Sequence, residues 1–259
     1  MHKKTLYFLL FTFLISGLGW GGLSIFARNG LLKFGQPLFM IPFLLAGFGP
    51  TIAPFIAIAL TDGKPGFTAY QKRLFNYKVS FLYYLFPLVS LLFLGLVSAL
   101  VNKSLSPRLM TLTQNPPLIL FGFFVQSLLF GGLEELGWRG FLQHELQKKH
   151  QIGITYLFVW LFWAVWHLPL FFIPGVSQYG KNFWVFSIYA LFFTMIFGWN
   201  YGRTKSIPLA ILGHALVNML SAVGYLNFLN RGFIRWSTLL IIMVALLSLH
   251  IFFPVKNAS

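Results

Sequence analysis

The chain has 259 residues, of which 58% are hydrophobic and only 9% are charged, and its mean hydropathy is +0.77. This composition excludes an ordinary soluble domain and predicts an all-α, multi-pass integral membrane protein. The net charge is +15, but the Lys and Arg residues are scattered through loops, so we expect them to contact the lipid bilayer and to bind no nucleic acid. The absence of cysteine excludes disulfides, thiol nucleophiles and cysteine-based zinc sites.

Eight apolar runs are each long enough to cross a bilayer. They cover residues 5–27, 37–61, 79–101, 117–133, 153–174, 183–202, 207–228 and 233–253. The first follows Lys3 and Lys4 but lacks a small-residue cleavage pattern, so we expect an uncleaved span. No linker interrupts the series. The sequence therefore predicts one transmembrane domain over residues 1–259, a polytopic bundle of about eight helices.

Two of these runs are interrupted by helix-breaking residues. The second contains Gly47-Phe-Gly-Pro50 and Pro54, and the fifth contains Leu168-Pro169. Membrane helices tolerate such breaks where neighbouring helices satisfy the freed backbone groups. We therefore expect the broken helices to border a cavity.

The distribution of basic residues predicts the orientation in the membrane. Eleven lie on the N-terminal side of the spans: Lys3, Lys4, Lys64, Lys72, Arg73, Lys78, Lys148, Lys149, Arg203, Lys205 and Lys256. Seven lie on the opposite side: Arg28, Lys33, Lys103, Arg108, Lys181, Arg231 and Arg235. The excess places both termini in the cytoplasm, and we expect a bacterial cell membrane; an inverted topology is the alternative.

Glu134 and Glu135 are two of only four acidic residues, and they follow an apolar run without ionisable groups. Ionisable groups at membrane depth usually face the protein interior and mark a functional site. Glu135 and Arg139 are four residues apart, which predicts an internal ion pair. Glu134 points about 100° away from that face, so we interpret it as a general base. In the alternative interpretation both glutamates lie among headgroups and bind Arg139 and water.

The stretch from Glu134 to Lys149 alternates charged with apolar residues. This pattern is typical of an amphipathic helix, which we expect along the cytoplasmic interface. On such a helix His144 and His150 are surface residues.

Two later spans carry isolated polar side chains. The fifth contains His167, and the seventh contains His214 and Asn218 four residues apart on one helix face. Taken singly, these are core residues or contribute hydrogen bonds between helices. Together with Glu134 they supply a base, two imidazoles and a carboxamide from three spans.

These residues resemble the three ordered motifs of the CAAX-protease and bacteriocin-processing family, also called CPBP or Abi, which includes the type II CAAX prenyl endopeptidases. The resemblance covers about residues 117–226 and comprises Glu134-Glu135-x-x-x-Arg139, Trp163-x-x-x-His167 with Pro169, and His214-x-x-x-Asn218. Trp163 stands where the family usually has Phe, a change that preserves an aromatic packing role.

The resemblance implies an intramembrane endopeptidase of eight helices with a water-filled cavity. Its substrate would be a membrane-associated peptide or protein, such as a lipidated protein or a bacteriocin-like peptide. Glu134 and His167 would activate a water for attack on a peptide carbonyl, while His214 and Asn218 would stabilise the oxyanion. The remaining motif residues, Glu135, Arg139 and Trp163, would support these four.

The same residues leave other functions open. Glu134, His167 and His214 could bind zinc, but no His-x-x-x-His pair is present and each ligand comes from a different span, which favours a mechanism without a cofactor. A transporter or channel could use the intramembrane Glu and His residues as a proton relay. A non-catalytic bacteriocin-immunity protein could retain the same fold.

Overall fold

The computed structural model describes residues 3–101, 114, 116–226 and 236–255, and throughout these residues the regular structure is helical. In chain order the elements are α1 (Lys3–Arg28), α2 (Pro37–Gly47), α3 (Gly49–Thr61), α4 (Gly63–Leu74), α5 (Phe81–Val101), α7 (Pro117–Phe130), η1 (Gly132–Glu134), α8 (Glu135–Gly137), η2 (Trp138–Gln143), α9 (His144–Gln147), α10 (Ile152–His167), η3 (Leu168–Phe172), α11 (Phe183–Thr204), α12 (Ile207–Ala222) and α13 (Trp236–Phe252). The elements η1 and η3 are 3-10 helices, whereas η2 is a π-helix.

Each of the eight predicted runs contains a helix. Four helical stretches are long and apolar enough to cross a membrane: Lys3–Arg28, Pro117–Gln147, Ile152–Phe172 and Phe183–Thr204. The pair α2 and α3 makes a further span bent by 47°, and shorter apolar helices cover Phe81–Val97, Ile207–Ala222 and Met243–Phe252. Large apolar side chains such as Leu18, Leu38 and Leu118 are exposed on the outside of these helices, as expected where lipid covers the surface. The predicted polytopic helical bundle is confirmed.

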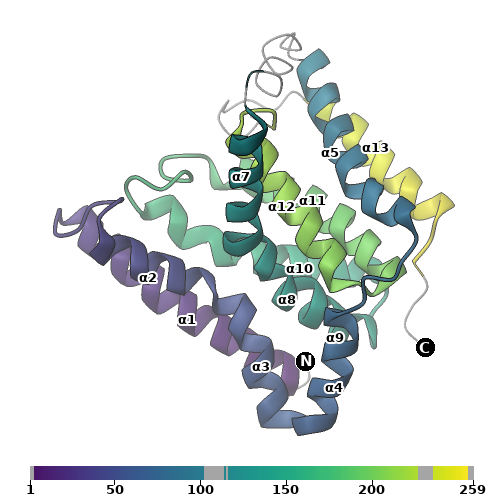
Figure 1. The fold of residues 1–259 in the computed structure, drawn as a ribbon, viewed down its shortest axis with the longest axis horizontal. Coiled ribbons are helices and arrows are strands. Elements are labelled where there is room, and N and C mark those ends of the chain that lie inside the picture. The colour runs from purple at the N-terminus through teal and green to yellow at the C-terminus, as the bar shows by residue number, and fades with distance from the viewer. Residues whose placement is uncertain (1–2, 102–113, 115, 227–235, 256–259) are drawn as a thin grey trace.

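The helices that carry the motifs occupy the middle of the bundle (Figure 1). There α12 packs against α7 and α11, and α11 packs against α10. On one side α1 packs along α2 and α3, and on the other α5 lies beside α13. The central helices are therefore shielded by a layer on each side.

One face of the bundle, here called the termini face, collects the ends of several elements. Lys4 at the start of α1 forms ion pairs with Asp62, after α3, and with Glu145 of α9. Arg203 at the end of α11 donates a hydrogen bond to the carbonyl of Pro254 at 3.0 Å. The start of α1 and the segment after α13 therefore both make polar contacts at this face. Five of the basic residues used to predict the orientation lie outside the described residues: Lys103, Arg108, Arg231, Arg235 and Lys256.

The prediction of an amphipathic surface helix after α7 is wrong. The helical stretch continues from α7 through η1, α8, η2 and α9 to Gln147, and Trp138, Arg139 and Phe141 are at most 1% exposed. Some of its polar side chains have partners inside the bundle; Gln143, for example, donates to the carbonyl of Gly198 at 2.8 Å. Even His144 is partly buried. An alternation of charged and apolar residues does not show whether the polar side chains contact water or buried polar groups of a neighbouring helix.

Glycines allow this segment to enter the core. A Cβ atom on Gly137 would lie 2.2 Å from the carbonyl oxygen of Pro50, so α8 approaches the backbone of α3 directly. One on Gly140 would lie 2.5 Å from Ile207 of α12. Small residues permit such close approach between membrane helices. Gly137 and Gly140 therefore allow the charged residues of the first motif to lie between α3 and α12.

Candidate active site

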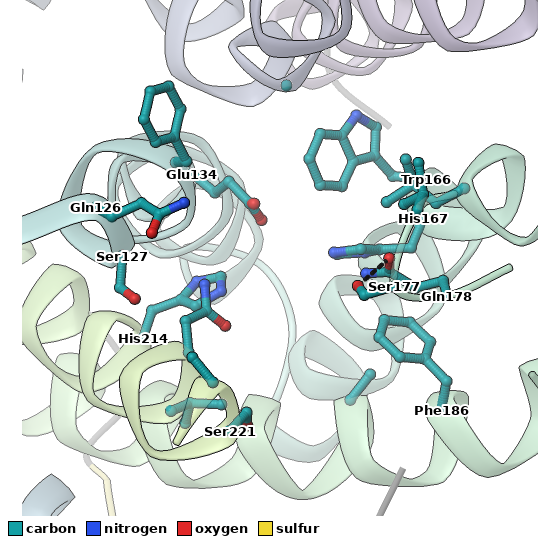
Figure 2. Close-up of a pocket in the computed structure, with 18 of the residues that line it drawn as sticks. Gln126, Ser127, Glu134, Trp166, His167, Ser177, Gln178, Phe186, His214 and Ser221 are labelled. Atoms are coloured by element: carbon teal, nitrogen blue, oxygen red, sulfur yellow. Dashed lines mark hydrogen bonds between the residues drawn. The ribbon is translucent and has the colours of Figure 1, made fainter. Parts of the chain in front are cut away.

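A cavity of about 590 Å³ lies between the broken pair α2 and α3, the helices α7, α10, α11 and α12, and the connection after η3. Its lining includes Gly47 and Phe48 at the first break and Leu170 at the second. The expectation that the broken helices border a cavity is therefore confirmed. Most of the wall is apolar and aromatic. Figure 2 shows the polar side chains that lie among these residues.

Glu134 reaches the cavity from η1, where the chain departs from the α7 geometry at Gly131. The residue is only 8% exposed. The indole N–H of Trp163 donates to its Oε2 atom at 3.1 Å, while Oε1 has no hydrogen-bond partner among the described residues. One carboxylate oxygen is thus held in place and the other is available to a ligand or a water.

His167 ends α10 and reaches the cavity from the opposite wall. Its Nδ1 atom lies 2.8 Å from the carbonyl oxygen of Trp163. A carbonyl only accepts, so Nδ1 carries a proton and Nε2 of the neutral ring is an acceptor. Figure 2 shows Glu134 and His167 pointing toward each other across the cavity. Trp166 and Phe186 pack against the imidazole, with ring centroids 4.7 and 4.9 Å away.

Glu135 and Arg139 lie behind the cavity wall and form a buried cluster with His214, which lines the cavity. Arg139 Nη1 donates to Glu135 Oε1 at 2.7 Å, so the predicted ion pair is confirmed. The same oxygen lies 2.8 Å from Nδ1 of His214. The Arg139 guanidinium also lies 4.7 Å from the ring centroid of Trp163, close enough for a cation–π interaction. The bond from Glu135 to His214 joins α8 to α12, and spacing along one helix could not indicate it.

Asn218 lies one turn beyond His214 on α12 and lines the same cavity. Its amide rests directly over the backbone of Gly131, because a Cβ atom there would lie 2.0 Å from Asn218 Nδ2. The carboxamide is therefore held next to the turn that presents Glu134.

The four predicted catalytic residues, Glu134, His167, His214 and Asn218, all line this one cavity. The predicted supporting residues lie close to them, and Trp163 supplies a hydrogen bond in addition to packing. Sequence reasoning did not single out several other polar lining residues: Gln126, Ser127, Ser177, Gln178, Lys181 and Ser221. Of these, Lys181 entered only as one charge of the topology count, and its place between two predicted spans gave no sign of a role in the cavity.

The alternative zinc set does not fit the observed geometry. Among the described residues, no group of three His, Asp or Glu side chains gathers closely enough to hold a metal ion. We therefore derive no step of the chemistry from a metal.

Comparisons with known proteins point to one family. Residues 116–220 match the family model described as type II CAAX prenyl endopeptidase Rce1-like. A curated relative, CAAX prenyl protease 2 of Methanococcus maripaludis, is 29% identical over 236 residues, which cover 84% of this chain and 83% of the relative. The family match runs from the start of α7 into α12 and includes all the motif residues.

Proposed function

Because residues 116–220 match the Rce1-like type II CAAX prenyl endopeptidase model and the chain is an integral membrane protein, we propose that it is an intramembrane endopeptidase in which Glu134 activates the attacking water. The observation that carries this proposal is the position of Glu134. Its carboxylate is almost fully buried, one oxygen accepts from Trp163, and the other is free opposite His167. A carboxylate placed in this way can bind a water and accept its proton.

The proposed hydrolysis needs only the side chains of the cavity. A water bound between Glu134 Oε1 and His167 Nε2 gives its proton to the carboxylate as its oxygen attacks the peptide carbonyl carbon. The carbon–nitrogen bond then breaks, and the proton held by Glu134 passes to the leaving amine. The products are a carboxylic acid and an amine, and the enzyme returns to its starting state.

The oxyanion formed during this attack requires hydrogen-bond donors. The Asn218 amide supplies two N–H groups close to the turn of Glu134. His214 has Nδ1 bonded to Glu135, so its Nε2 donates to an oxyanion when the ring carries a second proton.

The substrate we propose is a peptide or protein segment that reaches the cavity from the membrane. Aromatic side chains such as Trp166, Phe186 and Phe193 line the walls and would contact apolar residues on either side of the scissile bond. A transporter and a non-catalytic immunity protein remain as alternatives, and neither of these would cleave a peptide.

The test is cleavage of membrane-anchored fluorogenic peptides, prenylated and unprenylated, by the purified full-length chain in lipid vesicles. We expect defined fragments by mass spectrometry from the wild type and none from Glu134→Ala. Fragments released equally by both proteins would contradict the assignment of Glu134 as the base. If no peptide of the panel is cleaved, the endopeptidase proposal fails and the alternatives are favoured.

A further inference from the structure

Lys181 is the one lysine or arginine in the described lining of the cavity, where Glu134 is the one acidic residue. It lies in the connection between η3 and α11, just before the Asn182 cap of α11, and it is partly buried. Its ammonium group has no hydrogen-bond or ion-pair partner among the described residues. Ser177 and Gln178 of the same connection also line the cavity, and their side chains form a hydrogen bond with each other at 2.7 Å.

None of the acidic side chains of the chain forms an ion pair with Lys181. There are four, and all are described. Asp62 and Glu145 pair with Lys4 at the termini face, and Glu135 pairs with Arg139. The fourth, Glu134, accepts from Trp163 and has no ion pair with Lys181. Lys181 therefore stands at the cavity without a side-chain counterion from its own chain.

Other cations of the bundle that lose contact with solvent do have partners. Arg139 is matched by Glu135 at 2.7 Å, and Lys205 donates to Gln147 at 2.9 Å. Partial burial lowers the pKa of Lys181 from its ordinary value, which reflects the cost of desolvating an unpaired ammonium group. An anion bound beside it would offset that cost, and the apolar walls would strengthen the attraction.

We propose that Lys181 binds a carboxylate of the substrate, so that the enzyme selects peptides with apolar residues at the scissile bond and a carboxylate to one side of it. This inference rests on the proposed endopeptidase function. Aromatic side chains, among them Phe186, line the cavity together with the base Glu134 and the cation Lys181, so a single extended peptide would contact all three kinds of group. The carboxylate can belong to an Asp or Glu side chain or to the free end of a peptide chain.

The test compares the kinetics of matched peptides in neutral phosphatidylcholine vesicles. One series places Asp or Asn at successive positions beside the same apolar cleavage sequence, and a second ends in a free acid or an amide. For the wild type we expect KM to be about 3- to 10-fold lower with the carboxylate in one of the two series, the range of a partly buried ion pair. The series that responds identifies the source of the carboxylate.

Variants of Lys181 then assign the effect to this residue. Lys181→Gln should raise KM for the carboxylate peptide to the value for its neutral partner. Lys181→Glu should instead favour a peptide with Lys at that position. Lys181→Arg should retain the preference for the carboxylate. The matched control is Lys33→Gln, an exposed lysine in the connection between α1 and α2 that does not line the cavity, which should behave as wild type. Thermal unfolding checks that each variant is folded. If Lys181→Gln and Lys181→Glu do not fold, the proposal is still tested by Lys181→Arg, which should retain the preference for the carboxylate.

Failure of this inference is distinct from failure of the proposed function. If the wild type cleaves the peptides with the same KM whether or not they carry a carboxylate, the carboxylate site is overturned while the endopeptidase stands. A loss of activity in Lys181→Gln that is equal for all peptides would likewise overturn it, since this would indicate a contact with lipid or a role in the shape of the connection. No cleavage of any peptide would instead contradict the proposed function itself.

Discussion

Glu135 connects the helix of the first motif with that of the third through a single oxygen. Its Oε1 atom accepts from Arg139 and lies 2.8 Å from His214 Nδ1, and all three residues are at most 4% exposed. Removing one partner of such a buried pair leaves a charge without compensation, which is strongly destabilising. Glu135 therefore fixes both the helix segment that follows Glu134 and the ring orientation of His214.

The role of His214 can be separated from metal binding by substitution. We expect His214→Ala to lower kcat by about 10²–10³-fold, the usual effect of losing one oxyanion donor. Under this account a chelator leaves wild-type activity unchanged and elemental analysis finds no stoichiometric zinc. Asn218→Ala is the matched control, because a carboxamide is a poor zinc ligand and its loss should spare any bound metal.

A zinc enzyme would give the opposite pattern. The purified wild type would contain one equivalent of zinc, His214→Ala would contain none, and chelation would inactivate the wild type reversibly. That result would replace the mechanism without a metal by one in which Glu134, His167 and His214 are ligands.

At the scale of elements, the site depends on the interruption between α7 and α8. The chain leaves α-helical geometry at Gly131, turns through η1, and resumes at Glu135, so that adjacent glutamates face different surroundings. Glu134 faces the cavity, whereas Glu135 is completely buried. The absent side chain of Gly131 leaves the space in which the Asn218 amide rests.

This packing predicts the effect of a methyl group at Gly131. In Gly131→Ala the new Cβ atom would meet Nδ2 of Asn218 at 2.0 Å, and the amide, as the end of a flexible side chain, would move away. We expect kcat to fall at least about tenfold, since small displacements of reacting groups are costly, with little loss of thermal stability. Gly122→Ala on α7 is the control, because a Cβ atom there has no neighbour within 4 Å.

The double variant Gly131→Ala/Asn218→Ala checks the assignment. If the methyl group acts by moving Asn218, its effect should largely disappear once that side chain is gone. Unchanged kcat in Gly131→Ala, or full additivity in the double variant, would contradict the proposed position of Asn218.

The sequence predicts the spans and the motif residues better than the contacts between helices. The eight apolar runs could be located because spanning a bilayer requires only a local apolar length. The Glu135 to Arg139 pair follows from helical spacing, and the resemblance brought Glu134, His167 and Asn218 to one site. The bond from Trp163 to Glu134 and the burial of the segment after α7 depend on neighbouring helices, so local patterns could not reveal them.

At the scale of the whole molecule, the cavity and the two ends of the described chain lie at different faces. Phe34, Ser177 and Lys181 line the cavity from the connections between α1 and α2 and between η3 and α11. These connections lie at the far ends of α1 and α11 from Lys4 and Arg203, which belong to the termini face. If the basic excess orients the termini face toward the cytoplasm, the cavity faces the other side of the membrane.

Cysteine labelling in intact cells tests this orientation, and the chain has no native cysteine to interfere. We expect Lys149→Cys to react only after an impermeant maleimide gains access to the cytoplasm. Lys181→Cys should react from outside the cell. The reversed result would place the cavity on the cytoplasmic side and make cytosolic segments of membrane-anchored proteins the accessible substrates.

The central claim, that Glu134 is the base, is tested most directly by the kcat of Glu134→Gln on a cleaved peptide. This substitution preserves the shape of the side chain and removes its basic oxygen, so we expect a loss of about 10²–10⁴-fold with folding close to wild type by thermal unfolding. Asp62→Asn makes the same chemical change at the termini face, outside the cavity, and should leave kcat near that of the wild type. Turnover by Glu134→Gln within tenfold of the wild type would contradict the account.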